Sequence, residues 1–250
     1  RVIAHSLWIG ERMTKVLVTG GAGFIGSNLV DALLREGYEV RVLDNFSTGR
    51  RQNIEHVKKE IELIEGDMRD QEITDQAVAG IDMILHEAAL PSVPRSIKAP
   101  VTSDAVNVGG TLKLLSSAQK AGVQRMIMAS SSSIYGNTVE LPKHEGMTPK
   151  PMSPYAVTKL AGENYLRVYS ELYDMETLAI RYFNVFGPKQ NPEGPYAAVI
   201  PIFINRLLKN EVCNIFGDGT NSRDFTYIDN VVQANFLAAT TNDSQALNQV

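Results

Sequence analysis

Short apolar runs alternate with segments of helical spacing along most of the chain. Lys15–Thr19 and Glu39–Leu43 are apolar runs rich in β-branched residues, which is typical of buried strands. Between them, apolar residues recur on one face of Phe24–Arg35, and Gly37 follows as a glycine that ends a helix would. Further strands are predicted at Ile61–Glu65, Met83–His86, Met126–Ala129 and Thr177–Arg181, and further helices at Val101–Ala121 and Pro154–Tyr173.

Such an alternation predicts a parallel sheet covered by helices on both faces, which is a doubly wound α/β fold of the Rossmann type. After Asn184 the alternation loosens, and Pro and Gly become frequent. We therefore expect two domains, a Rossmann domain over residues 13–184 and a smaller, partial lobe over residues 185–250.

The composition excludes several classes of protein. The 250 residues carry a net charge of −4 without a Lys/Arg-rich run, so nothing favours nucleic acid as a partner. No apolar stretch approaches the roughly 20 residues that span a bilayer. The single Cys213 suits a reducing compartment, so we expect a cytoplasmic protein, and the four His share no metal-ligand spacing. Met13 precedes the first strand as a native start would, while the chain stops at Val250 without a helix stop, which suggests a fragment.

A glycine-rich turn follows the first predicted strand. Gly20, Gly23 and Gly26 have the spacing of a dinucleotide-binding turn, with a strand before them and a helix after them. The turn and the helix N-terminus would bind a pyrophosphate. Asp44 ends the second strand, where a carboxylate accepts hydrogen bonds from a ribose and favours NAD over NADP. The alternative is that Asp44 caps a turn.

Tyr155 and Lys159 lie one helical turn apart in S-P-Y-A-V-T-K, so both fall on one helical face. We expect the ammonium group of Lys159 to lower the pKa of Tyr155 and make it a usable base. The alternative is an ordinary surface pair. Four consecutive serines, 130–133, follow a predicted strand and could hydrogen-bond a sugar or a reacting oxygen. The other interpretation of these serines is a polar turn.

Together these motifs resemble the extended short-chain dehydrogenases/reductases, and within them the NAD-dependent epimerase/dehydratase family. The segments G-G-A-G-F-I-G, L-D-N-F-S-T-G, Y-A-V-T-K, R-Y-F-N-V-F-G-P and S-R-D-F-T-Y-I-D carry the resemblance, which runs from about Lys15 to Val250. It is greatest to UDP-hexose 4-epimerases, of the UDP-N-acetylglucosamine, UDP-glucose or uronic acid type, truncated at the C-terminus. The resemblance implies that Tyr155 removes the proton of the sugar 4-hydroxyl while NAD takes and later returns a hydride.

The resemblance also assigns site residues. Catalysis would fall to Ser131, Tyr155 and Lys159. Cofactor contacts would come from Gly20, Gly23, Phe24, Ile25, Gly26, Asp44, Asn45, Ser47, Thr48, Gly49, Asp67, Met68, Ala88, Ala89, Asn107, Ser130, Tyr155, Lys159 and Tyr182. Substrate contacts would come from Pro91, Ser92, Val93, Ser131, Ser132, Ser133, Tyr155, Asn184, Ala198, Val199, Asn214, Phe216 and Arg223. Asn184 and Arg223 would bind the diphosphate, although Arg223 could instead pair with its neighbour Asp224.

Other functions remain open at this point. Related 4,6-dehydratases carry an Asp-Glu pair after the catalytic hydroxyl, and related decarboxylases carry a Glu, whereas this chain has Ser132, Ser133 and Ile134. This difference favours an epimerase over an elimination. A 4-keto-sugar reductase and a non-catalytic dinucleotide-binding protein are the remaining alternatives. The family also pairs two helices across a two-fold axis, so we expect a homodimer through Leu112, Leu115, Leu160, Leu166 and Tyr169, unless this face is buried within the chain.

Overall fold

The computed structural model describes residues 8–9, 12–193, 197–215 and 217–243. Its centre is a sheet of six parallel strands in the order β5-β4-β3-β6-β7-β8. The strands are β3 (Lys15–Thr19), β4 (Glu39–Asp44), β5 (Ile61–Glu65), β6 (Met83–His86), β7 (Arg125–Ser131) and β8 (Glu176–Tyr182). The predicted doubly wound Rossmann-type sheet is confirmed, and each predicted strand is present within two residues of its expected bounds.

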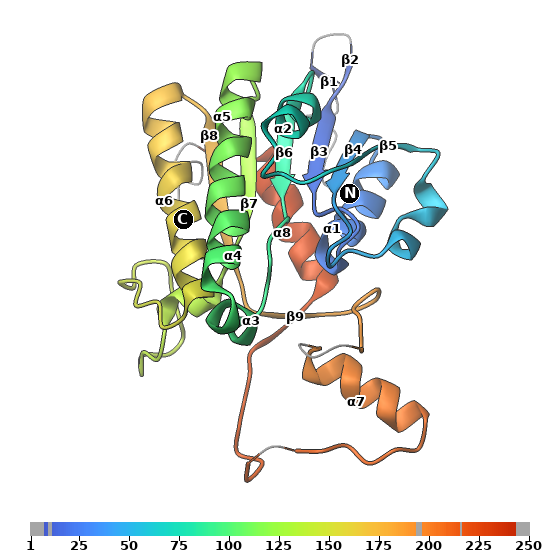
Figure 1. Cartoon of the computed structure of the whole chain (residues 1–250), viewed down its shortest axis with the longest axis vertical. Coiled ribbons are helices and arrows are strands. Elements are labelled where there is room, and N and C mark those ends of the chain that lie inside the picture. The colour runs from blue at the N-terminus through green and yellow to red at the C-terminus, as the bar shows by residue number, and fades with distance from the viewer. Residues whose placement is uncertain (1–7, 10–11, 194–196, 216, 244–250) are drawn as a thin grey trace.

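Helices cover both faces of this sheet (Figure 1). Helix α1 (Phe24–Arg35) lies against α8 (Ile228–Thr240) on one face. On the other face, α5 (Thr111–Ala121) packs between α2 (Gln71–Val78) and α6 (Pro154–Tyr173). Two apolar cores result, one under each helical layer.

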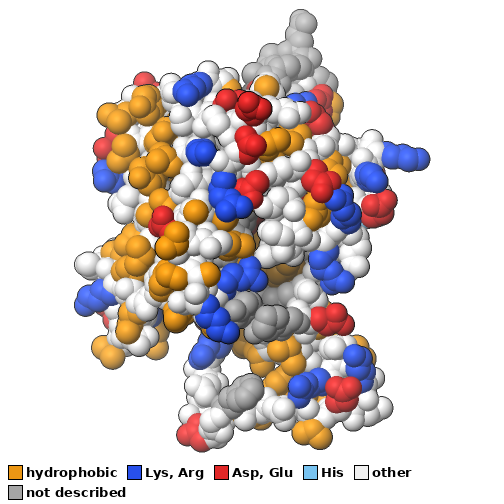
Figure 2. Space-filling view, viewed as in Figure 1, with side chains coloured by type: hydrophobic (Ala, Val, Ile, Leu, Met, Phe, Trp, Pro, Cys, Tyr) orange, Lys and Arg blue, Asp and Glu red, His pale blue; other side chains and the backbone are white. Residues whose placement is uncertain are grey.

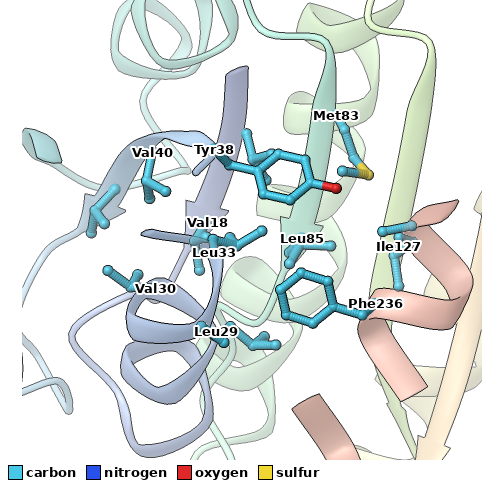
Figure 3. Close-up of a cluster of buried hydrophobic side chains, with 14 of the residues drawn as sticks. Val18, Leu29, Val30, Leu33, Tyr38, Val40, Met83, Leu85, Ile127 and Phe236 are labelled. Carbon is cyan, nitrogen blue, oxygen red and sulfur yellow. The ribbon is translucent and has the colours of Figure 1, made fainter. Parts of the chain in front are cut away.

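The core under α1 and α8 joins residues from the two ends of the chain (Figure 3). The ring of Phe236 on α8 lies 6.2 Å from that of Tyr38, and both are less than 10% exposed. Val18 and Leu85 lie beneath them on neighbouring strands. Helix α8 is therefore part of the Rossmann core, although it follows residue 184, where we expected the domain boundary.

The predicted helix over Val101–Ala121 is present, but it is not a uniform α-helix. It consists of α4 (Pro100–Asp104), a π-helical segment η3 (Ala105–Gly110) and α5. The π segment contains two consecutive glycines, and π-bulges in helices are frequent at functional sites. The short helices α2 and α3 (Val93–Lys98) were not predicted, because α2 is mostly polar and α3 is shorter than two turns.

Short elements complete the described chain. Helices η1 (Arg51–Asn53), η2 (Glu55–Val57) and η4 (Ser132–Tyr135) are single turns. Strands β1 (Trp8–Ile9) and β2 (Arg12–Met13) form an antiparallel pair. After residue 184, β9 (Asn184–Phe186) pairs in parallel with β10 (Phe225–Tyr227), and α7 (Val199–Leu208) lies apart from the sheet at the bottom of Figure 1.

The second apolar face expected on α5 and α6 is partly buried inside the molecule. Leu115 and Leu166 are at most 2% exposed in the core under these helices, so they cannot contact another chain. The outward face of α6 presents other apolar side chains, among them Val157 and Leu172, at 52% and 67% exposure. Apolar side chains gather over this region at the left of Figure 2. None of the helices in the described ranges is long and apolar enough to cross a bilayer.

Candidate active site

A cavity of about 630 Å³ lies along the carboxyl ends of the parallel strands. Its wall takes residues from the loops after β3, β4 and β5 and from the ends of β6, β7 and β8. The strand order reverses between β3 and β6, and crevices at such a switch point are where open α/β sheets bind ligands. The sheet therefore brings the predicted cofactor site and the predicted proton site to one cavity.

The glycine turn between β3 and α1 is closely packed. Gly20 has a φ of +68°, and a Cβ there would lie 2.8 Å from the backbone of Ala88. A Cβ on Gly26 would lie 2.3 Å from the carbonyl oxygen of Gly20. Gly23 caps α1 without a side chain over the first turn of the helix, and all three glycines line the cavity. The turn thus presents bare backbone and a helix N-terminus, which fits a pyrophosphate.

Asp44 is held by the turn that it faces. Its carboxylate accepts hydrogen bonds from the backbone N–H of Ala22 at 2.9 Å and of Phe46 at 2.8 Å. Burial raises its pKa, and these two hydrogen bonds act against that rise. Asp44 therefore does cap the turn, which was the alternative interpretation of this residue, and its carboxyl group still lines the cavity. One residue can fix the turn and accept a hydrogen bond from a ribose.

Asp67 lines the same part of the cavity and belongs to a small polar network. The guanidinium of Arg69 donates to both of its carboxylate oxygens, at 2.9 and 2.8 Å, and Asn45 donates at 2.8 Å. The hydrogen bonds from Arg69 are the main cause that lowers the pKa of Asp67 to about 2. Asp67 is therefore ionised and paired. Arg69 also lines the cavity and was not among the predicted residues.

Tyr155, Lys159 and Ser131 meet at the other side of the cavity. Tyr155 and Lys159 lie in the first two turns of α6, and Ser131 ends β7. The Lys159 Nζ donates to the carbonyl oxygen of Ala129 at 2.7 Å and lies 5.9 Å from the centre of the Tyr155 ring. Ser131 forms a hydrogen bond with the Tyr155 hydroxyl, which lowers the pKa of Tyr155.

The expectation that Lys159 lowers the pKa of Tyr155 is wrong for this structure. Burial disfavours the phenolate and raises the pKa of Tyr155 to about 12, although Ser131 acts in the opposite direction. Burial also lowers the pKa of Lys159 to about 8. The periodicity of the sequence places these two residues on one helical face, but it does not show how deeply they are buried.

A carboxyl group that was not among the predicted residues lies beside this pair. Glu87 follows β6 and lines the cavity, and its Oε1 accepts a hydrogen bond from the Tyr182 hydroxyl at 2.9 Å. Asn235 of α8 donates to the same hydroxyl at 2.6 Å. Burial raises the pKa of Glu87 to about 7. Its position between a strand end and Ala88, which was predicted to contact the cofactor, is a signal that could have identified it.

Another carboxylate, that of Glu163, is buried, and hydrogen bonds occupy both of its oxygens. Arg181 donates to both of its oxygens at 3.0 and 2.9 Å, and Ser130 donates to one of them. Arg181 also donates to the Tyr135 hydroxyl at 3.2 Å. This network fixes the end of β8 to α6 behind the cavity.

Most of the predicted cofactor residues line the cavity. They are Gly20, Gly23, Phe24, Ile25, Gly26, Asp44, Asn45, Ser47, Thr48, Gly49, Asp67, Met68, Ala88, Ala89, Ser130, Tyr155, Lys159 and Tyr182. Asn107 does not line it. The amide of Asn107 bonds the backbone N–H of Leu90 at 2.7 Å and the hydroxyl of Thr158 at 3.1 Å, so it fixes the loop after β6 from the π segment.

The predicted substrate residues are more dispersed. Pro91, Ser131, Tyr155 and Ala198 line the large cavity. Ser92 caps α3 with a φ of +96°, Ser132 and Ser133 begin η4, and neither these three residues nor Val93 line it. Phe216 lies outside the described residues. Asn214 lies in the loop after α7 and lines neither pocket.

A smaller pocket of about 250 Å³ adjoins the cavity, because Val185 and Ala198 line both. Asn184, Val199 and Arg223 are among its lining residues. Asn184 donates to the carbonyl oxygen of Asp224 at 2.9 Å, and the exposed Arg223 donates to that of Ser222 at 2.7 Å. The two residues predicted to bind a diphosphate therefore share one pocket between β9, β10 and α7.

Known proteins resemble this chain over nearly its whole length. Residues 16–250 match the model of the NAD dependent epimerase/dehydratase family. The chain is 40% identical over 225 residues to a putative UDP-glucose 4-epimerase of Methanocaldococcus jannaschii, which covers 89% of this chain and 72% of that relative.

Solved structures agree with this match. A UDP-N-acetylglucosamine 4-epimerase from Methanobrevibacter ruminantium M1 has a TM-score of 0.88 at 39% identity, covering 92% of this chain and 74% of the other. DesIV, a dTDP-glucose 4,6-dehydratase from Streptomyces venezuelae with NAD bound, has a TM-score of 0.84 at 34% identity, covering 91% and 72%.

Proposed function

Because the chain belongs to the NAD-dependent epimerase/dehydratase family, we propose that it interconverts the 4-epimers of a UDP-hexose, of the UDP-N-acetylglucosamine or UDP-glucose type. NAD is its cofactor. The observation that carries the proposal is the convergence of Tyr155, Lys159 and Ser131 on the cavity that the glycine turn also lines. A proton acceptor and a dinucleotide site in one cavity are what reversible oxidation of a hydroxyl requires.

The cavity fits NAD on several observations. The glycine turn leaves the space that a Cβ would fill, α1 directs its N-terminus at the cavity, and Asp44 lines it with an acceptor for a ribose. When bound, NAD supplies a nicotinamide that accepts a hydride and gives it back. Gly20, Gly23 and Gly26 would face the pyrophosphate, and Lys159 and Tyr182 would hold the reacting end.

The residues of the chain then handle the proton. Tyr155 would take the proton of the sugar 4-hydroxyl and return it after the sugar has turned over, so that the net reaction is an isomerisation. The hydroxyl of Ser131 would hydrogen-bond both the Tyr155 hydroxyl and the 4-oxygen of the sugar, since it already forms a hydrogen bond with Tyr155. The raised pKa of Tyr155 means that the phenolate needs a further positive charge nearby, and the oxidised nicotinamide is a cation.

We place the UDP moiety in the smaller pocket. Arg223 lines it as an exposed guanidinium, which suits bidentate binding of a diphosphate, and Asn184 lies beside it. Because this pocket adjoins the large cavity at Val185 and Ala198, a sugar attached to the diphosphate would extend towards Tyr155.

A 4,6-dehydratase is the second candidate, favoured by the likeness to DesIV and by Glu87 in the cavity wall. Elimination of water needs an acid and a base in addition to the tyrosine. Of the lining carboxylates, Asp44 ends β4 and Asp67 follows β5, both away from Tyr155, and Glu87 accepts a hydrogen bond from Tyr182. Because one carboxyl group does not supply both an acid and a base, we prefer the epimerase.

A proton NMR time course tests the proposal. Full-length protein with catalytic NAD is given UDP-glucose, UDP-N-acetylglucosamine and UDP-glucuronic acid in parallel. We expect a new anomeric signal of a 4-epimer from one of them and at least about a 100-fold lower rate in Tyr155→Phe, because the general base is lost. Tyr165→Phe, on the same helix and away from the cavity lining, should keep the rate.

The outcomes separate the alternatives. A 4-keto-6-deoxy product would identify the dehydratase. Bound NAD without an epimer from any of the three sugars would contradict the UDP-hexose assignment.

A further inference from the structure

Glu87 is a partly buried acid that the proton transfer described above does not use. It leaves the sheet at the end of β6, while Tyr182 ends β8, and β7 lies between these two strands. The hydrogen bond from Tyr182 to Glu87 therefore crosses over the end of β7. Lys159 reaches that end from the opposite face of the sheet, where it donates to Ala129.

The hydroxyl of Tyr182 is held from two sides. It donates to Glu87 and accepts from Asn235, which in turn donates to the carbonyl oxygen of Val231 within α8. The wall of the cavity beside Lys159 is thus tied to a helix that the chain forms some 140 residues after Glu87. An ionisable group in such a chain of hydrogen bonds affects both the charge and the position of its neighbours.

We propose that Glu87 is a positioning residue for the proton site, whose carboxyl group provides the counter-charge of Lys159 and fixes the Tyr182 hydroxyl at the cavity wall. In its effect on the reaction the inference rests on the proposed function. It adds to that function a group that controls the charge around the base without touching the substrate.

The charges around Glu87 support this role. Burial is the main influence on the pKa of Lys159, Tyr155 and Tyr182, and the negative charge of Glu87 acts on each of them towards a higher pKa. Glu163 of α6 also raises the pKa of Lys159, but it is already paired with Arg181 of β8. His86 lies beside Glu87 on β6 between the hydroxyls of Thr19 and Thr111, and burial keeps it neutral by lowering its pKa to about 3. Glu87, with a pKa raised by burial to about 7, changes its charge near neutral pH.

Infrared spectroscopy tests the inference without substrate. In full-length protein, with and without NAD, we expect the carbonyl band of a protonated carboxylic acid that disappears with a midpoint at about pH 7. The Glu87→Gln variant should lack this band. Glu39→Gln, at the exposed start of β4 and the opposite edge of the sheet, should keep it. If wild-type and Glu87→Gln proteins show the same spectrum at about pH 6, where an ordinary glutamate is ionised, Glu87 does not change its charge near neutral pH and that part of the inference is wrong.

The pH dependence of kcat/KM provides the second measurement. With NAD bound, the positive nicotinamide would favour the Tyr155 phenolate, so the rise of the profile with pH would report deprotonation of Tyr155 and its fall deprotonation of Lys159. Because the charge of Glu87 raises both pKa values, Glu87→Gln should move both limbs to lower pH by about one unit, and Glu87→Asp should restore them. A residue that only packs would change the rate and leave both limbs in place, which would overturn the proposal.

Two further results keep the test decisive. If Glu87→Gln does not fold, Tyr182→Phe removes the donor to Glu87 and should shift the infrared midpoint upwards, whereas an unshifted midpoint would contradict the proposal. A titrating band without epimerisation of any UDP-sugar would support the role of Glu87 and count against the proposed reaction. Epimerisation without the band would support the proposed reaction and count against the role of Glu87.

Discussion

At the scale of single residues, the cofactor site depends on glycines, which have no side chain, as much as on residues with functional side chains. The backbone of Gly20 adopts a left-handed conformation against Ala88, and a Cβ on Gly26 would lie only 2.3 Å from the carbonyl oxygen of Gly20. Any side chain at Gly26 would push the helix N-terminus away from the turn. The distance between helix and turn determines whether both can reach one pyrophosphate.

Replacing Gly26 by Ala tests this geometry. The added Cβ would meet backbone atoms at 2.3 and 2.9 Å, which cannot move aside as a flexible side chain can. We expect an overpacking cost of about 1–3 kcal/mol and at least about tenfold weaker NAD binding, measured by calorimetry. In Gly109→Ala the new Cβ would meet nothing within 4 Å, so its NAD affinity should equal that of wild type. Equal affinities in both variants would contradict the role of Gly26.

Residue types and spacing were enough to predict the glycine turn, Asp44, and the Tyr155–Lys159 pair, because each has a motif in a short stretch of sequence. They were not enough for the charge state of Tyr155, which depends on burial by distant segments. Glu87 was missed because its partner Tyr182 lies 95 positions away in the sequence.

At the scale of elements, two buried arginines close the C-termini of helices on opposite faces of the sheet. Arg41 on β4 donates to the carbonyl oxygens of Ala77 and Ala79 at the end of α2, at 2.8 and 2.7 Å. Arg125 on β7 donates to Ala239 and, at 2.9 Å, to Thr241 at the end of α8. These last carbonyls have no partner within their own helices, so a cation there satisfies them and opposes the helix dipole.

Arg125→Met should therefore loosen α8. The methionine keeps much of the apolar stem but leaves buried carbonyl oxygens unsatisfied, so we expect a loss of about 2–4 kcal/mol in the free energy of unfolding. Urea unfolding provides the value, and hydrogen exchange should show faster exchange in α8 than in α5. As a control, Arg35→Lys changes an exposed cation at the end of α1 and should leave the free energy of unfolding unchanged. A loss in Arg125→Met below about 0.5 kcal/mol would exclude this role.

Strands were easier to predict than helices. A strand buried on both faces must be apolar along its whole length, so β3 and β6 stand out in the sequence. The short α2 carries few apolar residues, because only one side of it meets the sheet, and the π segment has no periodicity of its own. Helix α8 was not predicted, although its Phe236 completes a core that begins at Val16.

At the scale of the whole molecule, the outward apolar face of α6 is the feature that favours assembly. Val157 and Leu172 are more than half exposed on this helix, and such residues are expected where another chain covers them. We propose a homodimer through this face, with Leu115 and Leu166 excluded because they belong to the core.

Leu172→Arg tests the dimer. A buried charge on each side of the two-fold interface should shift the protein from dimer towards monomer, as measured by sedimentation equilibrium. Leu208→Arg, at a position on α7 that is also more than half exposed, should leave the oligomeric state unchanged. A wild-type monomer, or a dimer that both variants preserve, would show that the α6 face is not the interface.

The contact between Tyr38 and Phe236 also has a consequence for synthesis. Nearly 200 residues separate these rings, so at 5–20 residues per second the ribosome needs roughly 10–40 s after Tyr38 to deliver its partner. Until then one side of a nearly complete sheet stays open to water and to other nascent chains. The time during which a chaperone is most useful to this protein is therefore set by the position of its last described helix.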